Sequence, residues 1–340
     1  MIIPVKTTLG GYDIVLERGA LAKAGELLDL NRKVMIVSDD GVPVQYIDTV
    51  AGACGEVHKV IIGKGETHKT LESFQMIADK MLEAGFSRKD CIVAVGGGVV
   101  GDLTGFVASA YKRGIDFYNI PTTSLSQVDS SIGGKTGVNY NNVKNIIGAF
   151  YQPAKVIIDP DVLKTLSARQ VSNGLSEAVK MSLTSDPELF AIFEQSDSFD
   201  DATIDKIIEK ALLIKKSVVE KDEKEQGLRK ILNFGHTIGH GIETVCVSAG
   251  GEQEFYHGEC VALGMTVMCS DEVKARLIPV LEKLGLPTSC KIDEEKVFEA
   301  VKQDKKANAD GISAVFVPEV GKYKLVNITL DEVRNIIKKF

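Results

Sequence analysis

Short runs of β-branched residues alternate with helical patterns through the first half of this chain. Between these runs, 71–84 and 99–111 have helical periodicity. Alternation of strands and helices predicts an α/β domain, in which helices cover both faces of a parallel sheet. The runs that have the length and composition of buried strands are 34–37, 60–62, 91–95, 117–120 and 156–158.

The pattern changes after Asp159-Pro160 and is mostly helical up to about residue 306. Neither a repeat nor a low-complexity linker separates the two halves. We therefore expect an α/β domain over 1–160 and a mainly helical domain over 161–340, with a cleft between them. The clearest elements of the second half are helices at 202–223, 229–245, 257–277 and 330–340 and strands at 312–317 and 323–328.

Composition excludes several classes of protein. The chain has 340 residues, 44% hydrophobic and 26% charged, which is ordinary for a globular protein with about two domains. A net charge of −7 argues against a nucleic-acid binder. No apolar run is long enough to span a membrane, and the first residues do not resemble a secretory signal. Six cysteines without C-x-x-C spacing fit reduced thiols, so we expect a cytoplasmic protein.

A glycine-rich turn, Gly96-Gly-Gly-Val-Val-Gly101, lies between a predicted strand and a predicted helix. Such a turn lets a pyrophosphate approach the backbone and the helix N-terminus. The ordinary dinucleotide fingerprint also needs an acidic residue about 20 positions later, and none is present there. Asp39 and Glu66, after earlier strands, are the candidates to hold the adenosine end. The alternative is a tight turn that needs glycine only for its geometry.

Three of the five histidines fall within one short window: His236, His240 and His257. The first two are four residues apart, so on one helix they share a face. A catalytic zinc takes three nitrogen or oxygen ligands and keeps one open position, so two histidines and a carboxylate would suffice. Glu177 is a candidate because it interrupts an apolar helix face, where an unpaired carboxylate is costly. Each histidine taken singly also fits a structural role.

Basic residues recur in apolar or glycine-rich contexts of this acidic chain. Cations gathered at one place attract small anions, and Arg and Lys bind phosphate and carboxylate groups. Lys215, on a charged helix, also fits an ordinary surface position. The basic residues concerned are Lys135, Lys144, Lys180, Lys215 and Arg229.

Taken together, the motifs between about residues 65 and 306 resemble those of 3-dehydroquinate synthases, of the sugar-phosphate cyclase group. Their joint occurrence in this order is highly specific, whereas the first 60 residues add little. The motifs are GGGVVGDLTGF at 96–106, YKRGI at 111–115, PTT at 121–123, DSSIGGK at 129–135, KN at 144–145, GLSEAVK at 174–180, DE at 222–223 with GLR at 227–229, LNFGHT at 232–237, HGE at 257–259 and DKK at 304–306.

The resemblance implies an N-terminal α/β domain with a parallel Rossmann-like sheet that binds NAD, and a mainly α-helical C-terminal domain with a divalent metal, Zn²⁺ or Co²⁺. It makes Glu177, His236 and His257 the metal ligands and places His240 in the active site outside the ligand set. It also implies a homodimer in which Arg113 reaches the phosphate in the neighbouring subunit.

The resemblance assigns two further sets of residues. The substrate-binding set is Asp129, Lys135, Lys144, Asn145, Lys180, Lys215, Arg229 and Asn233, with Lys305 or Lys306. The cofactor-binding set is Asp39, Glu66, Lys69, Gly97, Gly98, Val99, Asp102, Thr122 and Thr123, with Lys135 and Lys144 shared between the sets.

Two departures from the family pattern lie near the predicted metal site. The segment 247–254 is a glycine-rich insertion, and the usual Gly-Leu-Ala-Glu is Gly-Leu-Ser-Glu at 174–177. Neither removes a predicted ligand, so they affect the expected loop geometry and leave the expected activity unchanged.

The family reaction converts 3-deoxy-arabino-heptulosonate 7-phosphate into 3-dehydroquinate and phosphate, a step of aromatic amino-acid biosynthesis. NAD takes a hydride transiently, phosphate is eliminated, the hydride returns, and an aldol closure forms the ring. Polyol or iron-type alcohol dehydrogenases are an alternative, but they would release NADH and have no use for the cation cluster. Inosose- or valiolone-forming cyclases are another, and Arg229, Asn233 and 304–306 favour the carboxylated substrate. A non-catalytic homologue would lack a ligand or lysine.

Overall fold

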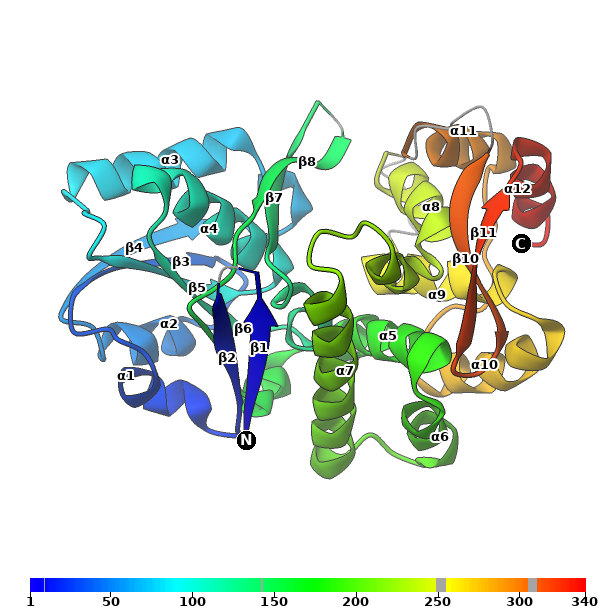
Figure 1. Cartoon of the computed structure of the whole chain (residues 1–340), viewed down its shortest axis with the longest axis horizontal. Helices are drawn as coiled ribbons and strands as arrows, with labels where there is room; N and C mark the ends of the chain where they lie inside the picture. Colours follow the sequence, from blue (N-terminus) through cyan, green and yellow to red (C-terminus); the bar gives the residue numbers. More distant parts are fainter. Residues whose placement is uncertain (9, 142, 249–254, 305–310) are drawn as a thin grey trace. The chain divides into compact units, whose positions relative to one another are not determined.

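The computed structural model describes residues 1–8, 10–141, 143–248, 255–304 and 311–340. The chain divides into two compact units (Figure 1). The first comprises 1–167 together with 215–223, and the second comprises 168–214 and 224–340. The first unit therefore also contains a stretch from the second half of the sequence, the C-terminal part of helix α7 (Asp201–Lys221).

A seven-stranded sheet in the order β1-β2-β9-β6-β5-β3-β4 forms the centre of the first unit. All neighbouring strands are parallel except β1 and β2, which form an antiparallel pair at one edge. The five strands expected from the sequence are all present, and the predicted α/β class is confirmed. The strands are β1 (Ile2–Thr7), β2 (Gly10–Leu16), β3 (Lys33–Asp39), β4 (Glu56–Ile62), β5 (Cys91–Gly96), β6 (Asp116–Pro121) and β9 (Lys155–Ile158).

Side chains that alternate along the central strands belong to two separate hydrophobic clusters, one on each face of the sheet. Val34 and Ile36 of β3 pack with α1 (Ala24–Leu27) and α2 (Val44–Ala51). Met35 and Val37 pack on the other face with α3 (Leu71–Glu83) and α4 (Gly98–Ala110). Figure 1 shows these two helix pairs on opposite faces of the sheet. Burial on both faces explains why the strands are continuous apolar runs in the sequence.

The second unit is mainly helical, and an antiparallel pair of strands, β10 and β11, accompanies its last helix as predicted. Among the described residues no helix is both long enough and apolar enough to cross a membrane. Besides the first part of α7, the elements are α5 (Ala168–Ser185), α6 (Pro187–Gln195), α8 (His236–Ser248), α9 (His257–Val267), α10 (Asp271–Lys283), α11 (Glu294–Asp304), β10 (Ile312–Glu319), β11 (Lys322–Ile328) and α12 (Leu330–Ile337).

The predictions of single long helices at 229–245 and 257–277 are wrong, because each segment forms two separate helices. The segment 229–245 is a short 3-10 helix (Leu228–Asn233) followed by α8, with Gly235 between them at φ +77°. Only glycine adopts this conformation without strain. The segment 257–277 ends as α9 at Val267, and α10 begins after Ser270, whose side chain accepts a hydrogen bond from the Val273 N–H.

Candidate functional site

The glycine-rich turn lies where β5 ends and α4 begins, at the carboxyl edge of the parallel sheet in the first unit. A Cβ atom at Gly97 would meet the Thr123 side chain at 3.1 Å, and one at Gly98 would meet the Ser130 hydroxyl at 3.0 Å. Glycine at these two positions keeps the turn uncrowded and leaves the first N–H groups of α4 accessible. This is the geometry that a pyrophosphate needs at a helix N-terminus.

The other predicted cofactor residues lie at the same edge of the sheet. Asp39 is the last residue of β3, Glu66 lies in a short 3-10 helix after β4, and Thr122 and Thr123 follow β6. Burial raises the pKa of Asp39, although its carboxylate accepts a hydrogen bond from the Gly41 N–H. In open parallel sheets this edge is where nucleotides bind.

Lys69 is buried and connects several of the predicted residues. Its ammonium group pairs with Asp102 of α4 and donates to the side-chain oxygen of Asn145. Burial raises the pKa of Asp102, and the charge of Lys69 opposes that shift. Asn145 has a left-handed backbone at φ +53°, and its N–H donates to the Asn139 side chain. Asn139 also donates to Glu66 at 2.8 Å, so the network extends to the proposed adenosine end.

The remaining predicted residues of the first unit are more dispersed. Lys215, on the stretch of α7 that belongs to this unit, pairs with Asp129. Lys135 and Lys144 are exposed on β7 (Lys135–Tyr140) and β8 (Val143–Phe150), a separate antiparallel pair.

Two other predicted residues of this unit flank or lie in α4. Arg113 is exposed directly after α4 and has φ +66°, a strained conformation for a residue with a Cβ. Val99 lies in the first turn of α4.

In the second unit, Glu177 of α5 is fully buried. One carboxylate oxygen pairs with the ammonium of Lys180, three residues later. The other oxygen, Oε1, lies 3.8 Å from Nε2 of His236 and 3.5 Å from Nε2 of His257. A buried carboxylate oxygen that faces two imidazole nitrogens is suited to bind a cation together with them.

Glycine contacts bring helices α8 and α9 close together and hold the histidines in place. A Cβ at Gly264 would lie 2.0 Å from the backbone oxygen of Gly235, and one at Gly239 would lie 2.8 Å from the backbone oxygen of Cys260. Because neither position has a side chain, the two backbones touch. His236 and His257, the first residues of α8 and α9, are thereby brought to the same place.

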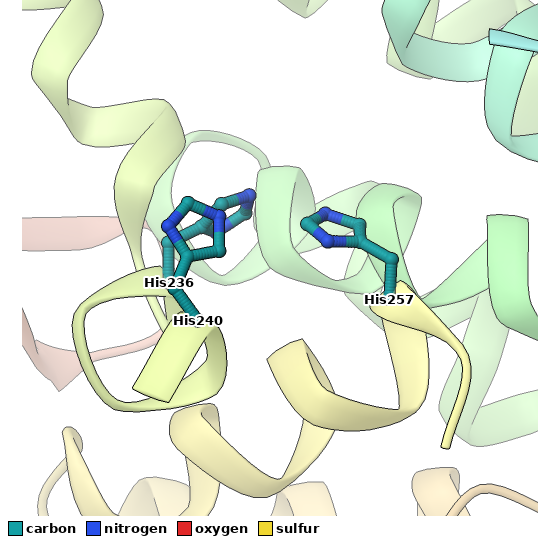
Figure 2. Close-up of side chains that lie close together, drawn as sticks. All are labelled: His236, His240 and His257. Carbon is teal, nitrogen blue, oxygen red and sulfur yellow. The ribbon is translucent and has the colours of Figure 1, made fainter. Parts of the chain in front are cut away.

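The imidazoles of His236, His240 and His257 point toward one another (Figure 2). One candidate ligand atom from each lies within 4.8 Å of the other two. Tetrahedral zinc with ordinary bond lengths separates its ligand atoms by about 3.3–3.5 Å. The distances from Glu177 to His236 and His257 are close to that spacing. The geometry also leaves His240 near enough to be a further ligand.

The electrostatic environment favours a bound cation. Burial alone would raise the pKa of Glu177, but Lys180 and the two nearby imidazoles hold it well below its usual value. Burial and the charge of Lys180 lower the pKa of His236, so this ring is neutral and can act as a ligand. Burial would lower the pKa of His257, but hydrogen bonds to Glu177 and Glu243 raise it to about 10.

Of the predicted substrate residues in this unit, Lys180 and Arg229 are buried, and Asn233 donates a hydrogen bond to Glu225. One continuous helix over 229–245 would place Arg229 and His236 on the same face, but the helix is broken at Gly235. Lys305, Lys306 and most of the insertion, 249–254, lie outside the described residues.

Three contacts at the start of α9 were missed from the sequence. Arg169 forms a bidentate ion pair with Glu259, and the Gly258 N–H donates to the Asn173 side chain at 2.6 Å. Glu243 of α8 lies 3.4 Å from Nδ1 of His257. Only the position of Glu243, two helical turns after His236, gives a signal in the sequence.

The fold and the two candidate sites are typical of a class of enzyme with a nucleotide-binding α/β domain and a helical metal-binding domain. Models of the 3-dehydroquinate synthase N-terminal and C-terminal regions match residues 59–173 and 174–307. A 3-dehydroquinate synthase of Streptococcus pneumoniae is 40% identical over 348 residues, covering 96% of this chain and 97% of the relative. The chain belongs to the 3-dehydroquinate synthase family.

Solved structures of sugar-phosphate cyclases share the fold over essentially the whole chain. A 2-deoxy-scyllo-inosose synthase complexed with carbaglucose-6-phosphate, NAD⁺ and Co²⁺ has a TM-score of 0.88 at 25% identity and covers 100% of both chains. A 2-epi-5-epi-valiolone synthase from Streptomyces hygroscopicus with NAD⁺ and Zn²⁺ bound has a TM-score of 0.87 at 27% identity and covers 96% of both.

Proposed function

We propose that this protein is an NAD- and metal-dependent lyase that converts 3-deoxy-D-arabino-heptulosonate 7-phosphate into 3-dehydroquinate and phosphate. The observation that carries the proposal is the buried Glu177 carboxylate, placed between two imidazoles and beside Lys180. Curated relatives of that name align over nearly the whole chain, which supports the same activity.

The metal would be held by Glu177, His236 and His257. Their distances suit a tetrahedral ion with one open position, as a catalytic site requires. We place His240 outside the ligand set, in a position to exchange protons with substrate. The inosose synthase was crystallised with Co²⁺ and the valiolone synthase with Zn²⁺, so either ion is a reasonable candidate here.

NAD would bind at the carboxyl edge of the sheet in the first unit. Gly97, Gly98 and Val99 would face the pyrophosphate, and Thr122 and Thr123 would line the path beside them. Asp39 and Glu66 would hold the adenosine end of NAD. The Lys69–Asp102 ion pair would lie beneath the cofactor and keep these residues in place. The Glu66–Asn139 and Lys69–Asn145 hydrogen bonds support this assignment because they hold these residues in place at the same edge of the sheet.

When bound, NAD supplies reversible hydride transfer, and the metal polarises hydroxyl and carbonyl oxygens. The chain's own residues bind and orient the substrate. Lys180 and Arg229 are buried cations and would replace the water that hydrates a carboxylate or phosphate. Asn233 would orient the same substrate through its amide.

Further cations of the predicted set would complete the binding of the substrate. Lys135, Lys144 and one lysine of 305–306 would add charge, and the Lys215–Asp129 pair would hold a hydroxyl. A base near the leaving group would be His240 or the departing phosphate itself.

We further propose that the protein acts in the cytoplasm as a homodimer, and that the domains predicted from the sequence at 1–160 and 161–340 bind the cofactor and the substrate, respectively. Arg113 would complete the phosphate site of the neighbouring subunit. Its exposure and its strained backbone support this role, since strain is retained where function needs it. A fully active monomer in solution would contradict the role of Arg113.

An inosose- or valiolone-forming activity is the nearest alternative, because those enzymes share the fold. The two solved cyclases are 25% and 27% identical to this chain, whereas the 3-dehydroquinate synthases reach 40%. A polyol dehydrogenase is the second alternative. Its substrates lack phosphate, so they would offer no anionic group for Lys180 and Arg229 to bind.

A substrate panel tests the proposal. The purified protein with NAD⁺ and Zn²⁺ is given the heptulosonate phosphate, glucose 6-phosphate or a simple polyol, and phosphate release and NADH are measured. We expect rapid phosphate release from the heptulosonate phosphate alone. Phosphate release mainly from the hexose phosphate would favour an inosose-type cyclase, and NADH accumulation with the polyol would favour a dehydrogenase.

A further inference from the structure

We propose that Glu243 is a positioning residue that orients the His257 imidazole toward the metal. This rests on the metal site of the proposed function. Glu243 lies on α8, seven residues after His236, so both side chains leave the same face of the helix. It is buried, with 8% of its surface exposed. A carboxylate buried beside a metal-binding histidine needs an explanation of its own.

The imidazole of His257 lies between two carboxylates. Its Nε2 is 3.5 Å from Glu177 Oε1, and its Nδ1 is 3.4 Å from Glu243 Oε2. The two nitrogens of an imidazole point to different sides of the ring, so one ion cannot be bound at both. With the metal at Nε2, Glu243 is therefore a partner of the ligand and takes no place among the ligands.

This arrangement fixes which nitrogen carries the proton. Glu243 accepts a hydrogen bond from Nδ1–H of His257, which leaves the lone pair of Nε2 directed at Glu177 and the ion. His236 is oriented in the same way by a different acceptor. Its Nδ1 lies 3.1 Å from the carbonyl oxygen of Phe234, and its Nε2 faces Glu177. Both histidines thus present Nε2 to the ion.

The two acceptors differ in charge, and this gives Glu243 a distinct role. A carbonyl orients a ring, whereas a carboxylate also makes the ring a stronger donor to the metal. His257 needs this support more than His236 does, because its side chain is more exposed than that of His236, at 28% against 11%. A less buried ring has fewer packing contacts to hold it.

The contacts of Arg169 and Asn173 with the start of α9 do not fix the direction of the His257 imidazole. Arg169 pairs with Glu259, and Asn173 accepts from the Gly258 N–H, so these contacts hold the backbone of the first turn. The imidazole can still rotate about its two side-chain bonds. Its direction is set by the acceptor at Nδ1, which is Glu243.

Zinc affinity of the whole protein tests the inference. The dissociation constant is measured by chelator competition for wild type, Glu243→Gln, Glu243→Ala and His257→Ala, with Thr244→Val as the control. Thr244 is the next residue on α8 and lies outside the buried core. We expect Kd to rise about 10- to 100-fold in Glu243→Ala and by a smaller factor in Glu243→Gln, which keeps an acceptor but loses the charge. Thr244→Val should bind zinc like wild type.

Two further readouts separate positioning from a structural role. The Tm of the metal-free protein should be nearly unchanged in Glu243→Gln, and the absorption spectrum of the Co²⁺-loaded variant should shift because a ligand has changed its donor strength. Wild-type Kd and an unshifted Co²⁺ spectrum in Glu243→Gln would overturn the role of Glu243, even if Glu243→Ala fails to fold.

The His257→Ala variant separates this failure from that of the metal site. If it loses zinc while the Glu243 variants bind normally, the metal site stands and the role of Glu243 is wrong. If it keeps full zinc content, both the metal site and the inference that rests on it are wrong.

Discussion

The contact between Gly264 and Gly235 makes Gly264→Ala a sharp test of how the metal site is built. A Cβ at Gly264 would lie 2.0 Å from the Gly235 oxygen and 2.9 Å from its carbonyl carbon. Ordinary carbon–oxygen contact is about 3.3 Å, so helices α8 and α9 must separate by about 1 Å or more. His236 and His257 begin these helices, and their separation would change with them.

The expected magnitudes follow from that displacement. Overpacking a close contact costs about 1–3 kcal/mol, and about 1 kcal/mol shifts Tm by roughly 2–4 °C in a domain of this size. Tm should therefore fall by about 2–12 °C. Metal–ligand distances tolerate only about 0.2 Å, so zinc Kd should rise by about tenfold or more.

Thermal unfolding and chelator competition measure the two effects. Gly52→Ala is the control, because Gly52 has φ −64° and a Cβ there would make only ordinary contacts at 3.4 Å or more. It should keep wild-type zinc affinity and be neutral or slightly more stable. If Gly264→Ala matches this control in both measurements, the close packing of α8 and α9 does not set the metal geometry.

Three further predictions address the other parts of the account. Lys69→Met should raise the Kd for NAD about tenfold or more, measured by fluorescence titration, with zinc content unchanged, because Asp102 and the cofactor path lose a charge-assisted hydrogen bond. Arg229→Ala should lower kcat/KM for the heptulosonate phosphate about 30- to 1000-fold, or about 2–4 kcal/mol, without loss of zinc, and near-normal kcat/KM would contradict its role. In the metal-free protein, burial would lower the pKa of His257, but hydrogen bonds to carboxylates raise it to about 10. Zinc must therefore displace a proton, and its affinity should rise about tenfold per unit between about pH 7 and 9. In the metal-free protein, protonated His257 adds to the free energy of unfolding. This contribution should be complete below about pH 6.5 and lost by about pH 10. A pH-independent zinc Kd would refute the last argument.

Much of the first unit could be predicted because its sheet is buried on both faces. Strands such as β3 and β5 are short continuous apolar runs rich in Val and Ile, so their length and composition identify them. The β1–β2 hairpin and the β7–β8 pair were not foreseen. Their exposed and polar positions interrupt the apolar pattern, and β8 has no fully buried residue. Local sequence carries little information about such strands.

The sequence indicates candidate residues for the site but not the geometry in which they lie. The helical periodicity of 229–245 continues across Gly235, so nothing in the pattern indicates the left-handed turn that separates Arg229 from His236. The stretch 215–223 belongs to the first unit, and its Lys215–Asp129 pair joins positions 86 residues apart. The contact of Glu243 with His257, 14 residues apart on the next helix, likewise follows from the packing of whole helices.

The most direct test of the central claim is a single-turnover experiment with the NAD- and zinc-loaded protein. NADH absorbance and phosphate release are followed together after mixing with the heptulosonate phosphate. The account predicts that NADH appears and then disappears, with one phosphate released for each substrate consumed and no net NADH. Phosphate release without any transient NADH, or NADH that accumulates with turnover, would contradict it.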